Sequence, residues 1–508
     1  MKMTSITIYD GANTIGGNKI FIEENGKGIF LDFGMNFKKY GVYYQEFLSS
    51  RSIRGIYDLF QLNLIPKLNV YRKDLIPLDY NISSFPKLKV EAILLSHAHM
   101  DHFGNIGLLN PEYPIICSPT TLMLLKGILD CSTPALGSDV VYYSLKKPKK
   151  DGRILETDKT KDVGRDFVLT HPFSDNLTDF MGTYLKSRKK LEEGNITQLK
   201  NFSLSFDIEP FEVDHSIYGA TGFIISGDTS IVYTGDFRLH GKRGKKSEKF
   251  IREAKDASIL IIEGTRAAKK DISESEDIVY ENCRRTAELA KGLIITDFSA
   301  RNFERLETFR KISDGIGRSL VITSRDAYLL SAIENAEDVN KTDDLLVFGE
   351  LRSTKRNWED LYLKGKSDIH YVDPKEISSN PENYVLCFSL FDIKNLLDIK
   401  PKNGTYIYSS SEAFEEESEF DFVRLYNWLT YFGFKIYGFD IVDDHGKPKP
   451  TFKKGYHASG HTSRKDLLWA IDTIDPETII PVHTDNPNWF KQNVDNALII
   501  KNGESCKL

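Results

Sequence analysis

A cluster of three histidines and one aspartate within six positions constrains this chain more than any other feature. It has the pattern His97-x-His99-x-Asp101-His102, in a chain with only 11 histidines among 508 residues. Residues 90–95, directly before it, are nearly all apolar and predict a strand that is buried on both faces. Imidazole and carboxylate groups are the ligands of catalytic zinc sites. The pattern therefore predicts a metal site on a loop that follows a buried strand.

Three further candidate ligands follow apolar runs elsewhere in the chain. His215 and Asp236 come after predicted strands, and His483 comes directly after the apolar residues 479–482. A lone histidine or aspartate in such a place is more often a structural residue. All of these side chains share the position just beyond a strand, however, and a site with two metal ions needs about six or seven ligands. Together they predict one such site.

Length and composition describe a globular chain of more than one domain. At 508 residues two or three domains are expected, and the composition, 40% hydrophobic and 28% charged, is ordinary for a soluble protein. No run of about 18 apolar residues occurs, and the start lacks the blocks of a signal peptide, so we expect no membrane association. The five cysteines are scattered and never spaced as Cys-x-x-Cys, which indicates a reducing, cytoplasmic compartment.

The pattern of apolar residues changes twice along the chain. Residues 1–264 open with short alternating strands, whereas residues 265–440 alternate apolar runs with helical stretches, which predicts a parallel sheet covered by helices. Residues 441–508 again carry histidines at loop positions. Two segments of the first part, the aromatic and basic residues 35–85 and the lysine-rich residues 132–200, are interpreted as insertions. The aromatic side chains can stack on bases, but they can equally form a local core or an oligomer contact. The apolar runs of the middle part lie at residues 292–296, 320–323, 384–388 and 405–408.

The order and context of these residues resemble those of the metallo-β-lactamase superfamily and, within it, the β-CASP nucleases of the ribonuclease J type. The resemblance covers nearly the whole chain and implies an α/β fold. Residues 1–264 and 441–508 would form an αββα sandwich, and residues 265–440 an inserted β-CASP domain with a parallel sheet flanked by helices. Residues 11–17 depart from the glycine-rich loop of the family. The chain ends soon after His483, so the dimer-forming C-terminal domain of ribonuclease J is expected to be missing.

The resemblance also implies roles for individual residues. Seven positions match metal ligands of the family and imply two zinc ions per chain, with manganese or magnesium as alternatives: His97, His99 and His215 for one ion, Asp101, His102 and His483 for the other, and Asp236 between both. Asp32 matches a buried aspartate that braces the site. Asp101, Glu263 and His461 match catalytic positions, with His461 as a general acid supported by Glu263. Glu263 can equally be an orienting residue that carries no proton.

Fewer residues indicate the substrate. Family members that act on RNA carry the last histidine ligand, here His483, whereas those that resemble DNA-repair nucleases usually lack it. Five residues resemble the family's pocket for the 5′-monophosphate of RNA, because small hydroxyls at a strand end can surround a phosphate: Ser409, Ser410, Ser411, His457 and Ser459. Their alternative is an ordinary polar turn. Such a pocket implies stepwise 5′→3′ trimming of single-stranded RNA, and internal cleavage stays open.

The resemblance thus predicts a zinc-dependent ribonuclease that hydrolyses phosphodiester bonds with two metal ions. Three other functions stay open. A DNA nuclease on the same scaffold is disfavoured by His483, and a non-catalytic RNA-processing subunit is disfavoured by the complete ligand set. A small-molecule hydrolase of the lactamase kind would leave residues 265–440 and His461 without a role. The sequence leaves the oligomeric state, a homodimer included, undecided.

Overall fold

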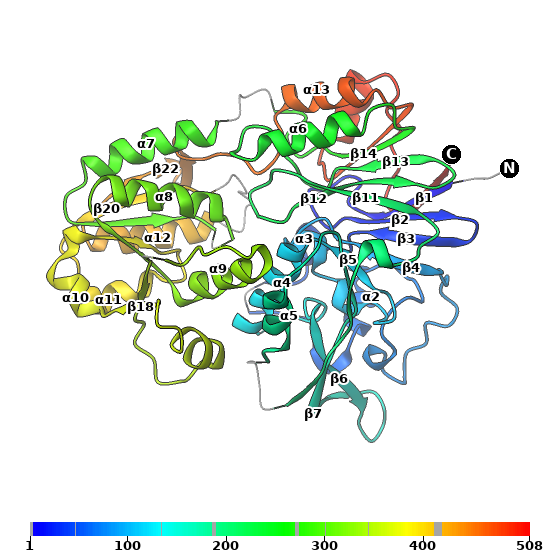
Figure 1. Cartoon of the computed structure of the whole chain (residues 1–508), viewed down its shortest axis with the longest axis horizontal. Helices are drawn as coiled ribbons and strands as arrows, with labels where there is room; N and C mark the ends of the chain where they lie inside the picture. Colours follow the sequence, from blue (N-terminus) through cyan, green and yellow to red (C-terminus); the bar gives the residue numbers. More distant parts are fainter. Residues whose placement is uncertain are drawn as a thin grey trace.

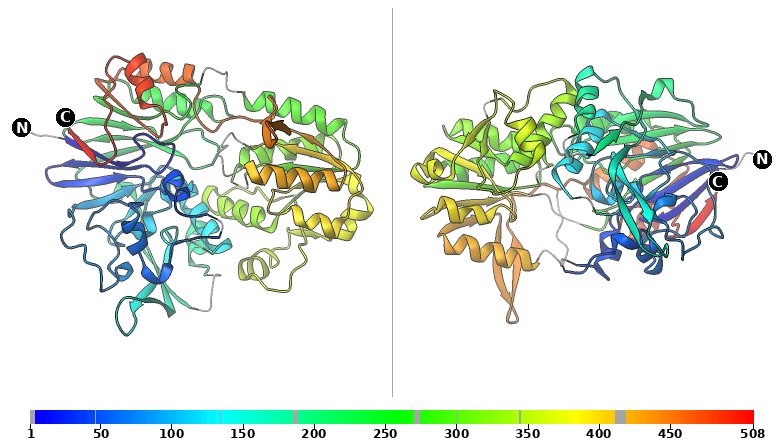
Figure 2. Two further views of the ribbon diagram at one scale, coloured as in Figure 1. Left: turned by 180° about the vertical axis from the view of Figure 1, so that it is seen from behind. Right: turned by 90° about the horizontal axis from the view of Figure 1, so that it is seen from below.

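The computed structural model describes residues 4–45, 47–133, 135–184, 189–269, 274–299, 301–343, 345–410 and 419–508. These residues form two halves that lie side by side, one built on two facing sheets and the other on a single parallel sheet (Figure 1). The last strand, β25 (Glu504–Lys507), pairs with the first, β1 (Thr4–Asp10), at the far end of the first half (Figure 2).

The first half is a sandwich of two sheets. The larger runs in the order β10 (Ile196–Gln198), β8 (Phe167–Leu169), β5 (Ile115–Cys117), β4 (Val90–Leu94), β3 (Lys27–Leu31), β2 (Lys19–Glu24), β1 and β25. The smaller runs in the order β11 (Asp207–Glu212), β12 (Thr221–Ser226), β13 (Ser230–Tyr233), β14 (Ile259–Glu263) and β24 (Thr478–Val482). Every second residue of β1 is buried, and Ile6 and Ile8 join Phe223 and Ile261 in the core between the sheets.

Helices cover the two outer faces of this sandwich. The apolar core outside the smaller sheet contains side chains of α6 (Gly244–Glu253), α13 (Arg464–Ile474) and α14 (Pro487–Asn493). The core outside the larger sheet contains side chains of α2 (Tyr57–Gln61), α3 (Met100–Phe103), α4 (Pro119–Cys131) and α5 (Asp175–Gly182) (Figure 1). The predicted αββα class is therefore confirmed.

The second half is inserted between two neighbouring strands of the smaller sheet. The chain leaves after β14 and returns as β24, which lies parallel to β14 with Glu263 opposite Val482. In between lies a seven-stranded, wholly parallel sheet in the order β18 (His370–Val372), β17 (Leu346–Phe348), β16 (Ser319–Ile322), β19 (Tyr384–Cys387), β15 (Leu293–Asp297), β20 (Gly404–Tyr408) and β21 (Phe434–Tyr437).

Helices also flank this parallel sheet, as predicted: α7 (Glu276–Glu288), α8 (Phe303–Gly315), α9 (Ser324–Glu337), α10 (Pro374–Ser379), α11 (Leu396–Ile399) and α12 (Glu419–Tyr431). A hairpin of β22 (Phe439–Asp444) and β23 (Lys447–Phe452) follows the sheet. The predicted residue boundaries of the domains, 264/265 and 440/441, stay a prediction. None of the described helices combines the length and the apolar character that a membrane crossing requires.

The two predicted insertions differ in structure. Residues 35–85 contain α1 (Phe37–Gly41) and α2, with Phe60 and Tyr71 buried and Phe47 exposed. Residues 132–200 contain a separate sheet of β6 (Tyr142–Pro148), β7 (Leu155–Gly164) and β9 (Lys190–Glu192). The same segment also supplies β8 and β10 to the larger sheet of the sandwich. Strands of three residues are too short to show a period, so the sequence pattern does not separate β8 and β10 from the insertion around them.

Candidate metal centre

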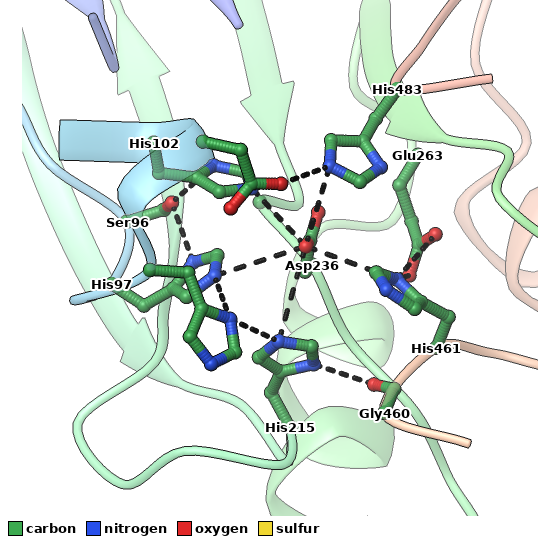
Figure 3. A network of polar contacts seen from close by, with 12 residues as sticks. Ser96, His97, His102, His215, Asp236, Glu263, Gly460, His461 and His483 are labelled. Atoms are coloured by element: carbon green, nitrogen blue, oxygen red, sulfur yellow. Dashed lines mark hydrogen bonds and ion pairs between the residues drawn. The ribbon is translucent and has the colours of Figure 1, made fainter. Parts of the chain in front are cut away.

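The predicted ligands converge at one edge of the sandwich, where strands of both sheets end (Figure 3). The loop after β4 carries His97 and His99, and α3 begins directly beyond it with Asp101 and His102 in its single turn. Asp236 follows β13, Glu263 is the last residue of β14, and His483 directly follows β24. His215 lies on the connection between β11 and β12. The side chains that follow strands in the sequence therefore lie together at a single place in the fold.

Two groups of ligand atoms form this centre. In the first, the Nδ1 atom of His99 lies 3.0 Å from Nε2 of His97 and 3.1 Å from Nε2 of His215. In the second, the ligand atoms of Asp101, His102, Asp236 and His483 all lie within 4.8 Å of one another.

Asp236 lies between the two groups. Its Oδ2 atom is 3.2 Å from Nε2 of His102 and 3.7 Å from Nε2 of His483, in the second group. The same oxygen is 3.8 Å from Nε2 of His97 and 3.9 Å from Nε2 of His215, in the first. A carboxylate in this position can contact an ion in either group.

In several histidines, the outer ring nitrogen, which is the one that faces away from the centre, lies at hydrogen-bond distance from an oxygen atom. Nδ1 of His97 lies 3.0 Å from the hydroxyl of Ser96, and Nδ1 of His215 lies 2.5 Å from the carbonyl of Gly460. Nδ1 of His483 lies 2.9 Å from the hydroxyl of Thr265. With the proton on the outer nitrogen, each ring presents the lone pair of its inner nitrogen to the centre, as metal-ligating histidines do.

The charge and burial of these groups fit divalent cations. Burial, reinforced by neighbouring imidazoles, holds the pKa of His97 and His99 well below the usual value, and burial lowers that of His215 to about 4. With their protons on the outer nitrogens, neutral rings 3.0–3.1 Å apart would face one another with lone pairs, an arrangement that a cation between them stabilises. Oδ1 of Asp236 is buried and has no hydrogen-bond partner among the described residues. Five imidazoles and two carboxylates are a donor set that suits zinc.

Asp32, to which the resemblance assigns a bracing role, lies behind the second group. Its Oδ2 atom accepts hydrogen bonds from Nδ1 of His102 at 2.7 Å, the hydroxyl of Tyr233 at 2.6 Å and the hydroxyl of Ser96 at 2.8 Å. Oδ1 accepts from the backbone N–H of Ser96 at 2.8 Å. Asp32 is fully buried and has a φ of 55°, in the left-handed region that aspartate and asparagine tolerate. The carboxylate therefore fixes the ring of His102.

Replacing Asp32 with asparagine should lower the affinity for the metal about 10- to 100-fold, the usual effect of losing such an outer contact. Asparagine keeps the shape and the backbone conformation but loses the negative charge that holds the His102 ring. Competition with a chromophoric chelator measures the affinity. Tyr233→Phe, which removes one of the donors to the same carboxylate, is the matched control and should have a smaller effect. Equal affinities of Asp32→Asn and the unaltered protein would contradict the bracing role.

Glu263 and His461 form a pair at the side of the centre. Both carboxylate oxygens of Glu263 lie 3.1 Å from Nδ1 of His461. The backbone N–H groups of Phe237 and Thr265 donate to the same carboxylate at 3.2 Å. Burial alone would lower the pKa of His461, but the Glu263 and Asp236 carboxylates raise it to about 9. His461 Nδ1 is 3.8 Å from Oδ2 of Asp236, so it also belongs to a third group of candidate ligand atoms with Asp236, Glu263 and His483.

The residues of the predicted phosphate pocket lie together but are largely engaged with other protein groups. The buried hydroxyl of Ser409 donates to the carbonyl of Tyr456 at 2.8 Å. The ring nitrogens of His457 lie 2.7 Å and 3.1 Å from the carbonyls of Gly438 and Ser410. The hydroxyl of Ser459 accepts from the backbone N–H of His461 at 3.2 Å. Ser410 lines a cavity of about 620 Å³ at the carboxyl edge of the parallel sheet, and Ser411 lies outside the described residues.

Sequence reasoning missed several residues of the site. Ser96 directly precedes His97 and Thr265 lies two positions after Glu263, and that closeness in sequence was the only available signal. Arg301 lines the same cavity as Ser410 and donates from Nη1 to the carbonyl of Ala98, between the first two histidine ligands, at 3.3 Å. No local pattern marks Arg301, because the loop that it contacts lies some two hundred positions earlier in the chain.

Comparison with known proteins agrees with this geometry. Residues 75–277 match the metallo-β-lactamase superfamily, and residues 451–490 match the Zn-dependent metallo-hydrolase RNA specificity domain. Fold and site thus define the class: the chain is a metal-dependent hydrolase of the metallo-β-lactamase superfamily. Within that superfamily, relatives of the ribonuclease J type match most of the chain, and this similarity supports the predicted resemblance to the ribonuclease J-like β-CASP family.

Individual relatives resemble the chain over most of its length. Ribonuclease J of Pyrococcus abyssi is 23% identical over 95% of this chain and 90% of its own, and ribonuclease J of Methanocaldococcus jannaschii is 23% identical over 96% of this chain and 92% of its own. A crystal structure of a protein of unknown function from Enterococcus faecalis covers 100% of both chains, with a TM-score of 0.69 and 19% identity. That likeness supports the fold.

Proposed function

We propose that the protein is a zinc-dependent ribonuclease that hydrolyses phosphodiester bonds of single-stranded RNA with two metal ions. The observation that carries the proposal is the position of Asp236, whose Oδ2 atom lies within 3.9 Å of ligand nitrogens in both groups. The cytoplasm as its location and a homodimer as its oligomeric state remain predictions.

Each group would hold one ion. His97, His99 and His215 would bind the first, and Asp101, His102 and His483 the second, with Asp236 contacting both. Bound there, two divalent ions would polarise the phosphodiester and lower the pKa of a water molecule. Asp101 would thus act as a ligand, and its Oδ2 atom lies 3.1 Å from Nε2 of His483.

The chain's own residues supply the proton for the leaving group. When water adds to phosphorus, the bond to the leaving oxygen breaks, and that oxygen takes a proton from His461. The contact between Nδ1 of His461 and Glu263 orients the ring, and Nε2 makes no hydrogen bond to the described residues, so it can face the substrate. Glu263 is buried and bound by two backbone N–H groups, which favours an orienting role for it.

RNA rather than DNA is proposed as the substrate for three reasons. His483 is present as the last ligand, and residues 451–490 match a domain described by its RNA specificity. The curated relatives named above are called ribonuclease J. A DNA nuclease on the same scaffold is the alternative.

The proposed 5′→3′ direction rests on the region around Ser410. Arg301 also lines the cavity of Ser410, and its guanidinium donates to the carbonyl of Ala98, between His97 and His99. Burial lowers the pKa of Arg301 to about 10, so it keeps its charge at neutral pH. A cation between the cavity and the metal centre can hold a terminal phosphate at a set distance from the ions.

Purified, zinc-loaded protein should degrade RNA with a 5′-monophosphate at least about tenfold faster than RNA with a 5′-hydroxyl, since a phosphate bound to a cation gains a charge-assisted hydrogen bond. It should degrade matched DNA more slowly than either. The length of the product from 5′-labelled RNA separates mononucleotide release from internal cleavage. Faster degradation of DNA would make the substrate assignment wrong, and equal rates for the two RNA ends would remove the phosphate pocket.

A further inference from the structure

We infer that Arg238, Glu276 and Arg305 position the loop that carries His461, and thereby control proton delivery to the leaving group. The inference rests on the proposed function, because it takes His461 as the general acid. It concerns a buried network of charged side chains at the seam between the two halves of the molecule, to which neither the motifs nor the comparisons assign a role.

Arg238 is the centre of this network on the side of the sandwich. It lies two residues after Asp236 and is fully buried. Its Nη1 atom donates to Glu276 at 3.1 Å and to the backbone carbonyl of Ser459 at 3.0 Å. Its Nη2 atom donates to Glu304 at 2.9 Å, and its Nε atom donates to Asp214, the neighbour of His215, at 3.3 Å.

Arg305, in α8 of the inserted half, completes the network. Its Nε and Nη2 atoms donate to one oxygen of Glu276 at 3.2 Å and 2.8 Å. Its Nη1 atom contacts the carbonyl and the hydroxyl of Ser409, and it donates to the carbonyl of Tyr456 at 3.4 Å. Glu276, the first residue of α7, thus bridges two guanidinium groups and joins the inserted half to the sandwich.

The network reaches the backbone on the approach to the proposed acid. The carbonyls of Tyr456 and Ser459 are held by Arg305 and Arg238, and Ser459 in turn accepts from the backbone N–H of His461. Arg238 itself lies on the loop of Asp236, so its guanidinium group sets the distance between that loop and the loop of His461. Because proton transfer requires contact at hydrogen-bond distance, a shift of about 1 Å in the acid loop would slow the reaction strongly.

The chemistry of the network favours a positioning role over a purely stabilising one. Removing charged groups from water is costly, and an apolar cluster of similar volume often stabilises a fold as well or better. Arginine, however, has donors in a rigid planar fork that fixes its partners in direction as well as in distance. Here the fork ends on backbone carbonyls of the site loops, which apolar packing could not hold.

The test uses a pair of aryl phosphodiesters, one with p-nitrophenolate and one with the more basic phenolate as the leaving group. The first leaves without a proton, whereas the second, like the alkoxide of RNA, needs one. Glu276→Gln should lower kcat on the phenyl ester about 100-fold, with KM and zinc content unchanged, and should affect the p-nitrophenyl ester much less. Asp74→Asn is the matched control. It breaks a two-point contact with the buried Arg72, away from the site loops, and should leave both rates unchanged.

Equal losses on the two esters, or a loss with Asp74→Asn as large as with Glu276→Gln, would overturn the inference. If Glu276→Gln does not fold, Arg305→Lys keeps the charge but not the fork, and it should give the same dependence on the leaving group. The outcome is separate from that of the proposed function. Hydrolysis of both esters without hydrolysis of RNA would refute the ribonuclease, while the ester pair would still decide the role of the network.

Discussion

Replacing Asp236 with asparagine should reduce hydrolysis by about three orders of magnitude or more and should lower the metal content from about two ions per chain. The substituted amide keeps the shape of the side chain but lacks the charge that faces both groups. The nearby imidazoles of His483 and His102 hold the pKa of the Asp236 carboxyl well below its usual range despite burial, so the charge is present at neutral pH. Elemental analysis after dialysis and initial rates on RNA measure the two effects.

The control for this substitution is Asp162→Asn. Asp162 lies on β7, outside the centre. It is also buried, and it accepts hydrogen bonds from Ser144 and Lys189. It should lower stability without loss of metal. A full metal complement in Asp236→Asn would show that this carboxylate is not shared between the ions.

Replacing His461 with alanine should abolish detectable cleavage of RNA, a loss of about two to four orders of magnitude, while the zinc content stays unchanged. Zinc should be retained because the ring of His461 pairs with Glu263 rather than with the two ligand groups. Its Nδ1 atom lies 3.1 Å from Glu263 but 3.8 Å from Asp236. Metal analysis and single-turnover kinetics on the same preparation provide the measurement.

A loss of zinc in His461→Ala would instead make His461 a metal ligand in the third group, with Asp236, Glu263 and His483. Glu263→Gln is the companion variant. It keeps a hydrogen-bonding partner for the ring of His461, so a smaller loss of rate is expected if Glu263 only orients that ring. A loss equal to that of His461→Ala would assign a proton-carrying role to Glu263.

Much of the fold was predictable because buried parallel strands have a simple sequence pattern. The apolar runs at 292–296, 320–323, 384–388 and 405–408 correspond to β15, β16, β19 and β20, with ends that agree within one residue. The strands β17, β18 and β21 of the same sheet were not predicted. They are three or four residues long, and they lie toward the two edges, where partial exposure weakens the apolar signal.

The candidate site was predictable to the extent that its residues follow strands. His97, His215 and His483 are marked by their type and by the apolar residues before them. Arg238, Glu276 and Arg305 carry no such mark, since a charged residue next to a helix or a turn is usually exposed to solvent. Their burial results from the packing of two halves that are far apart in the sequence.

The amino-acid sequence by itself determined the residue types of the candidate metal ligands, the strands that precede them and the parallel sheet of the second half, because these depend on residue type and on short-range periodicity. The sandwich of the first half was implied by the family resemblance. Only the tertiary structure decided which side chains touch. The parallel pairing of β14 with β24 brings Glu263 beside Val482, and so brings His461 and His483 to the same carboxylates, across some two hundred intervening residues. Such contacts depend on strand register and on the packing of the two halves, and no local stretch of sequence encodes either.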